Sequence, residues 1–179
     1  MVWFDLYTVC MARKGLRKDK KARAPKHQPI CGLWAAARAV GIRLQTAADV
    51  NNFRQDCITK GCISPKNGNW VGGTTEEERV RICEAHGYVV QYCDKFHGVN
   101  VKKMLMHKDV YQTRKKLLLC VDKHCLLVCS NMTKRKLWVS DQRGRPMRLV
   151  RKDKTPDADL VSILRQKVVS LCVVQLAQT

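Results

Sequence analysis

Apolar segments separated by short polar turns in the second half of the chain most constrain its fold. Residues 115–121 run almost directly into residues 124–130, and residues 137–141 follow after a polar turn at 131–136. Runs of this length and spacing predict consecutive antiparallel strands joined by tight connections. Residues 147–150 would add a further strand to the same meander.

Signals for helices precede these strands. The apolar run at residues 31–41 has the length of a short helix and ends at Gly41, which suits a left-handed C-terminal cap. Two capping boxes mark the starts of further helices: Thr46 with Asp49, and Thr75 with Glu78. The second of these helices is expected to end at Gly87, directly before the strand-like residues 88–93.

Shorter elements are expected elsewhere in the chain. Residues 60–73 are rich in glycine and predict a loop. We expect short helices at residues 100–107 and 160–166, and a last strand at residues 168–175. Early helices followed by strands that mostly pair antiparallel predict an α+β fold, with the N-terminal helices packed on the sheet.

The chain length of 179 residues suffices for one domain with a substantial hydrophobic core. We divide the chain into an N-terminal segment with a basic arm, residues 1–26, and a single folded domain, residues 27–179. Aromatic residues make up only 6% of the sequence, which disfavours a nucleic-acid platform built from stacked rings. No apolar run reaches the roughly 20 residues that a membrane-spanning helix needs.

The formal net charge of +19 is larger than solubility requires and indicates attraction to a polyanion, of which nucleic acid is the first candidate. Acidic protein and anionic lipid are the alternatives. Part of the charge lies in the arm, whose candidate phosphate-contacting residues are Arg13, Lys14, Arg17, Lys18, Lys20, Lys21 and Arg23. A solvated loop is the other interpretation of this arm.

Ten cysteines would suggest a disulfide framework in a short secreted chain, but no signal peptide precedes them here. Five occupy apolar helix or strand positions, where free cysteine acts as a small hydrophobic residue: Cys83, Cys93, Cys120, Cys129 and Cys172. We therefore expect a reducing intracellular compartment, the cytoplasm or the nucleus. A compact basic chain of this kind suits a viral or mobile-element product, in which case the compartment is that of the host cell.

One cysteine stands at the start of the first predicted helix. A helix N-terminus beside an imidazolium favours the thiolate over the thiol, so Cys31 is a candidate nucleophile. His124 begins one predicted strand and Asp141 ends the next, so antiparallel pairing puts both at the same end of the ladder. We expect His124 to be the base for Cys31 and Asp141 to orient its ring. Capping of the turn that follows is the rival role for Asp141.

These motifs resemble those of papain-like cysteine peptidases, most closely the double-glycine leader peptidases that process bacteriocins. In that family a Cys-Gly pair begins the catalytic helix, as Cys31-Gly32 does here, and a Gly-Gly-Thr segment precedes another helix, as residues 72–74 do. The family also has a histidine, apolar residues, a turn, and a strand that ends in Asp with Gly shortly after, which residues 124–144 match. The resemblance covers roughly residues 28–150.

The resemblance implies a papain-like fold and a thiol peptidase or isopeptidase that needs no cofactor. It implies catalytic roles for the Cys, His and Asp named above and an oxyanion-stabilising glutamine, for which Gln28 is the candidate and His27 and Gln142 are alternatives. The Josephin and ovarian-tumour deubiquitinases are similar in their catalytic logic. The expected substrate is therefore a polyprotein, a ubiquitin-like conjugate or a leader peptide.

Two other interpretations compete with the peptidase. A zinc site would draw on Cys57 and Cys62, or on the cluster at residues 120–129, although no Cys-x-x-Cys pair occurs and no metal is expected. The other is an inactive nucleic-acid-binding module on the same fold. It would contact phosphates through the arm and through Arg143, Arg145, Arg148, Arg151 and Lys152.

Overall fold

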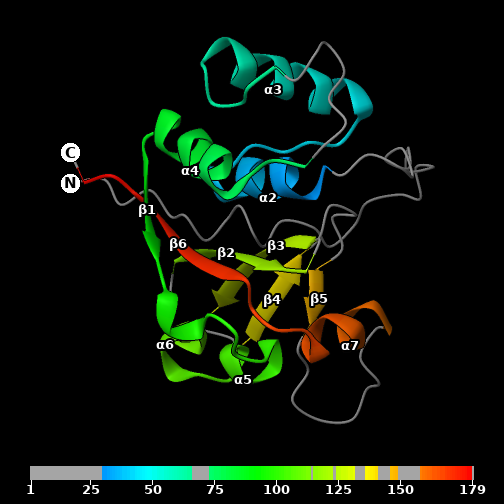
Figure 1. Cartoon of the computed structure of the whole chain (residues 1–179), viewed down its shortest axis with the longest axis vertical. Helices are drawn as coiled ribbons and strands as arrows, with labels where there is room; N and C mark the ends of the chain where they lie inside the picture. Colours follow the sequence, from blue (N-terminus) through cyan, green and yellow to red (C-terminus); the bar gives the residue numbers. More distant parts are fainter. Residues whose placement is uncertain are drawn as a thin grey trace.

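The computed structural model describes residues 30–65, 73–113, 115–122, 124–131, 136–140, 146–148 and 158–178. These residues form an antiparallel sheet with helices on both sides (Figure 1). The helices on one side are α2 (Cys31–Ala39), α3 (Ala47–Thr59) and α4 (Glu76–Ala85). On the other side are α5 (Val101–Leu105), α6 (Lys108–Tyr111) and α7 (Ala158–Arg165), and a single 3-10 turn, η1, spans Asp94–Phe96.

Six strands form the sheet in the order β1-β6-β2-β3-β4-β5, and all the described pairings are antiparallel. The strands are β1 (Tyr88–Tyr92), β2 (Lys116–Val121), β3 (His124–Asn131), β4 (Lys136–Ser140), β5 (Pro146–Arg148) and β6 (Ser170–Leu176). The predicted meander is confirmed, because β2 to β5 are neighbours in chain order. The α+β prediction is confirmed as well. Nothing in the sequence pattern indicates that β6 lies between β1 and β2.

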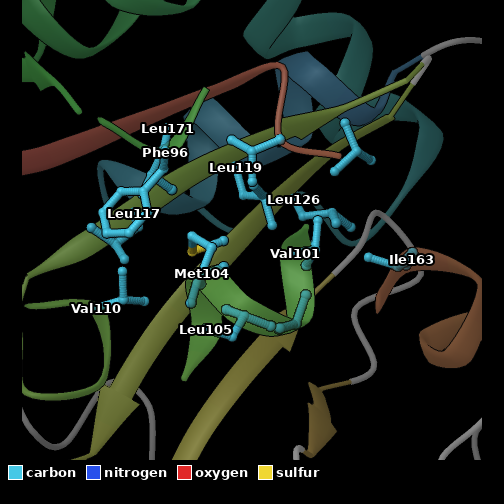
Figure 2. Packing of buried hydrophobic residues seen from close by; sticks show 14 residues of the cluster. Phe96, Val101, Met104, Leu105, Val110, Leu117, Leu119, Leu126, Ile163 and Leu171 are labelled. Atoms are coloured by element: carbon cyan, nitrogen blue, oxygen red, sulfur yellow. The ribbon is translucent and has the colours of Figure 1, made fainter. Parts of the chain in front are cut away.

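Both faces of the central strands are buried. Side chains of one face pack against α5 and α6 (Figure 2), among them Leu117, Leu119, Leu126 and Val128. Side chains of the other face pack against α2, among them Leu118, Cys120, Cys125 and Leu127. Burial of both faces explains why apolar residues follow one another along β2 and β3 and do not alternate with polar ones.

Both predicted capping boxes are present. Thr46 Oγ1 accepts the N–H of Asp49 at 3.1 Å, and Asp49 Oδ2 accepts the N–H of Thr46 at 2.8 Å. The box of Thr75 and Glu78 begins α4 in the same way. Glu78 is only 4% exposed and also accepts the N–H of Ser64 at 3.2 Å. The side chains thus satisfy N–H groups that the first turn of a helix leaves unpaired.

Two predicted helices differ in their bounds. The helix from Cys31 ends at Ala39, and Gly41 follows with φ of +89°, a left-handed conformation that suits glycine. The helix expected over residues 100–107 ends at Leu105 instead. His107 Nδ1 then accepts the N–H of Asp109 at 3.3 Å and caps α6 as a separate helix. None of the described helices has the length and apolarity needed to cross a bilayer.

Polar contacts fix the end of α2 against the sheet. Lys116 Nζ on β2 donates to the carbonyl of Ala39 at 2.6 Å, and the Tyr88 hydroxyl donates to the carbonyl of Val40 at 3.5 Å. These carbonyls lie at the C-terminal end of the helix, where no N–H group of a following turn is available to donate to them. The helix that carries Cys31 is therefore held at a fixed position over β2 and its neighbours.

Candidate active site

Cys31 is the first residue of α2. Ile30, which precedes it, supplies no side-chain cap, and the first turn contains no acidic residue. The partial positive charge of the helix N-terminus is therefore not neutralised by a carboxylate of its own first turn. Cys31 is half-buried, whereas Trp34, one turn further on, is 4% exposed and packs in the core.

The thiol of Cys31 is hydrogen-bonded to the imidazole of His124, the first residue of β3. The main-chain N–H groups of Cys125 and Gly32 also donate to the sulfur. Burial alone would raise the pKa of the Cys31 thiol. The hydrogen bonds, of which the one with His124 is the largest, outweigh burial and hold this pKa below its ordinary value. The structure thus brings together the predicted nucleophile and the predicted base.

The other predicted site residues lie outside the described residues: Gln28, His27, Asp141, Gln142 and the basic arm from Arg13 to Arg23. The last described pair of the β3–β4 ladder joins Leu127 to Ser140, the residue before Asp141. Strand β4 therefore runs toward the end of the ladder at which His124 begins β3. The orienting role of Asp141 and the oxyanion role of Gln28 stay predictions.

A loop packs directly against the residue that follows the nucleophile. A Cβ on Gly32 would lie 2.1 Å from Thr74 Oγ1 and 3.3 Å from Arg79 Nη1. Arg79 Nη1 in turn donates to the carbonyl of Thr74 at 2.6 Å. No sequence motif marked Thr74 or Arg79 as a separate site residue. Gly32 was the one sequence feature that could have indicated this contact, because glycine lets another segment of the chain approach the backbone closely.

Two more thiols lie on the same face of the sheet as α2. Cys120 on β2 stands directly opposite Cys125 on β3, and their sulfurs are 3.1 Å apart and hydrogen-bonded. Both residues are buried, with 7% and 3% of their surfaces exposed. The hydrogen bond from Cys125, assisted by the positive charge of Arg79, lowers the pKa of Cys120 despite burial. The same hydrogen bond raises the pKa of Cys125.

Five other described cysteines are in environments that favour the neutral thiol: Cys57, Cys62, Cys83, Cys93 and Cys172. Burial, the largest cause in each case, raises the pKa of Cys57, Cys83 and Cys172 to about 12. Cys93 and Cys129 were expected to be buried and are half-buried instead. All the described cysteines are free thiols.

Metal ligation finds no support within the described ranges. No three His, Cys, Asp or Glu side chains in these ranges are grouped as a metal ion would require. The described histidines other than His124 lie at helix ends: His86 follows α4, His97 follows η1, and His107 precedes α6.

Comparison with solved structures finds a chain described as the crystal structure of a double glycine motif protease from AMS/PCAT transporter in complex with the leader peptide. The match covers 86% of the present chain and 89% of that chain, with 10% sequence identity and a TM-score of 0.47. No protein-family model and no curated protein matches the sequence.

Proposed function

We propose that the chain is a papain-like cysteine peptidase in which Cys31 is the nucleophile and His124 is the general base. The observation that carries the proposal is the hydrogen bond between a thiol at the N-terminus of α2 and an imidazole at the start of β3. A cysteine with a lowered pKa beside a histidine is the arrangement that thiol acyl transfer needs. The half-buried position of Cys31 leaves part of its surface open to a substrate.

In the proposed reaction, His124 takes the proton of Cys31 and the thiolate attacks the carbonyl carbon of a peptide bond. The tetrahedral intermediate collapses, the C–N bond breaks, and the imidazolium of His124 protonates the departing amine. Water, activated by His124, then hydrolyses the thioester and restores the thiol. Asp141 is proposed to orient His124, and Gln28 to donate a hydrogen bond to the oxyanion.

The proposed substrate is a peptide or isopeptide bond of a protein. The three candidate classes are a polyprotein junction, a ubiquitin-like conjugate and a leader peptide. A probe for each class carries an electrophile in place of the scissile bond. The probe that labels Cys31 fastest identifies the substrate class.

The direct test is covalent labelling of the full chain with iodoacetamide and with these peptide and ubiquitin electrophiles. We expect Cys31 to be labelled first, and labelling to be lost in Cys31→Ala and strongly slowed in His124→Ala. Cys93→Ala is the matched control, because Cys93 is also half-buried but burial raises the pKa of its thiol. Labelling of Cys31 that is independent of His124 would contradict the proposal.

The net charge of +19 favours a second, compatible activity, which is binding of nucleic acid through the basic arm. This binding should weaken steeply as salt is raised and should persist in Cys31→Ala. Replacing the seven arm residues named above by glutamine should reduce the salt dependence. An unchanged affinity and salt slope in that variant would assign the binding to another part of the chain.

A further inference from the structure

The pair formed by Cys120 and Cys125 has the geometry from which a disulfide forms. The two residues face each other in the β2–β3 register, and residues opposite in an antiparallel ladder have Cα atoms about 4.5 to 5.5 Å apart. This separation falls within the range that disulfides span. Their sulfurs are 3.1 Å apart, about 1 Å more than the S–S distance of a disulfide.

A positive charge faces this pair from α4. Arg79 is partly buried, and its guanidinium donates to the carbonyl of Thr74 at 2.6 Å. Among the residues that the structure describes, no carboxylate lies within ion-pair distance of Arg79. The thiols of Cys125 and Cys120 are instead the main groups that stabilise its charged form against burial. The Glu76 carboxylate contributes less to Arg79 than these thiols do, and it opposes a thiolate at Cys120 less strongly than Arg79 favours one. A partly buried cation beside the two thiols therefore favours the thiolate.

We propose that Cys120 and Cys125 are a redox-active dithiol that a small hydroperoxide converts into a disulfide across β2 and β3. The Cys120 thiolate attacks an oxygen of hydrogen peroxide, so that an S–O bond forms, the O–O bond breaks, and hydroxide leaves and is protonated to water. Cys125 then attacks the sulfenic sulfur. The S–S bond forms, the S–O bond breaks, and the thiol proton leaves with hydroxide as a second water. Two thiols are thereby oxidised by two electrons and one peroxide is reduced.

This dithiol is connected to the nucleophile through one residue. Cys125 directly follows His124, and its main-chain N–H donates to the sulfur of Cys31. Closing the disulfide draws the two sulfurs from 3.1 Å to about 2.05 Å and so displaces Cys125 relative to Cys31. The inference that oxidation controls the active site rests on the proposed function. Oxidation should weaken the hydrogen bonds that keep the pKa of Cys31 low and should slow its reactions.

The test is peroxide treatment of the full chain, followed by alkylation of the remaining thiols and tryptic digestion. Cleavage after Lys116, Lys123 and Lys134 places Cys120 in the peptide 117–123 and Cys125 in the peptide 124–134. We expect a disulfide-linked pair of these peptides that disappears on reduction. Its absence, or a linkage that maps to Cys129 in the second peptide, would overturn the proposal. Cys129→Ser is the matched control and should leave the linked pair intact.

Variants separate the roles of the individual groups. Arg79→Gln should slow disulfide formation about tenfold, the effect of a pKa increase of about one unit on the thiolate fraction, and Arg79→Lys should recover part of the rate. Equal rates in wild type and Arg79→Gln would contradict a role for the cation. Cys120→Ala and Cys125→Ala cannot form the disulfide, so they measure any direct oxidation of Cys31 by the same peroxide.

Failure of this inference is distinguishable from failure of the proposed function. The linked peptides should form equally in Cys31→Ala, because the dithiol does not need the nucleophile. In wild type, peroxide should slow labelling of Cys31 about tenfold beyond the effect seen in Cys120→Ala, and reduction should restore it. Labelling of Cys31 at an unchanged rate in protein that carries the disulfide would overturn the coupling, and leave the peptidase proposal standing.

Discussion

Thr74 occupies the space that a side chain on Gly32 would need, because Thr74 Oγ1 lies 2.1 Å from the position of a Cβ there. Thr74 is buried, so alanine at position 32 can be accommodated only if the loop at residues 73–75 or the first turn of α2 moves. We expect Gly32→Ala to lower the free energy of unfolding by about 1–3 kcal/mol in urea denaturation. Alkylation of Cys31 should slow as well.

Two comparison variants identify the cause of this loss. Removing the obstructing hydroxyl in Gly32→Ala/Thr74→Ala should recover most of the stability, because Thr74 Oγ1 has no hydrogen-bond partner among the described residues. Gly41→Ala meets no atom within 4 Å and is strained only by its φ of +89°. It should therefore lose stability without any change at Cys31. If the double variant is as unstable as Gly32→Ala, the loss of stability does not come from a clash between the new Cβ and Thr74 Oγ1.

The pH dependence of Cys31 alkylation should report its hydrogen bond with His124. Because the pKa of Cys31 lies below its ordinary value, the alkylation rate should rise at a lower pH than it does for an unstructured cysteine peptide. His124→Gln should move the rise to higher pH, since the largest of the interactions that lower this pKa is removed. The rate is measured with iodoacetamide over a pH series, and a profile unchanged by His124→Gln would contradict the assignment.

The two capping boxes provide a matched pair of stability variants. Thr46→Ala and Thr75→Ala each remove the side-chain acceptor of one box and should cost about 1 kcal/mol of unfolding free energy. Only Thr75→Ala should also slow the alkylation of Cys31, because α4 carries Arg79 and begins next to the loop that packs on Gly32. Equal effects of both variants on alkylation would show that the slowing reflects general destabilisation.

His86 should make the stability of the fold sensitive to mild acid. Burial, assisted by the charge of Lys60, lowers the pKa of His86 in the folded protein. The folded state therefore binds fewer protons than the unfolded state, and stability falls as the pH drops through the unfolded histidine value of about 6.5. His86→Gln should lose less stability than wild type between about pH 7.5 and about pH 5. An equal loss in urea denaturation at the two pH values would contradict this contribution.

Local chemistry explains which parts of the fold were predictable from the sequence. The helix starts at Thr46 and Thr75 were correct because a capping box involves residues only three positions apart. The β2–β3 connection is similarly local. The meeting of Cys31 with His124 is different, since these residues are far apart in the chain. It was predicted from the chemistry that a thiol at a helix N-terminus needs, and the resemblance to a peptidase family agrees with it.

Long-range packing explains what the sequence did not indicate. The position of Arg79 beside Cys120 and Cys125 depends on how α4 packs against α2 and on which face of the sheet α2 covers. No spacing within α4 distinguishes Arg79 from Arg81, which lies two residues later and is exposed. The early end of the helix expected at residues 100–107 was also not evident from the sequence, since His107 does not continue that helix but caps α6.

The place of β6 has a consequence for the nascent chain. Strand β1 pairs with β6 in the described sheet, and β2 has β6 as its neighbour on the side away from β3. Translation must therefore reach Leu176 before the strand that precedes His124 gains its second neighbour. Such a late, long-range insertion is expected to be a slow step of folding. The strand that leads to His124 should thus keep one open edge until β6 has been synthesised, however early the rest of the sheet is made.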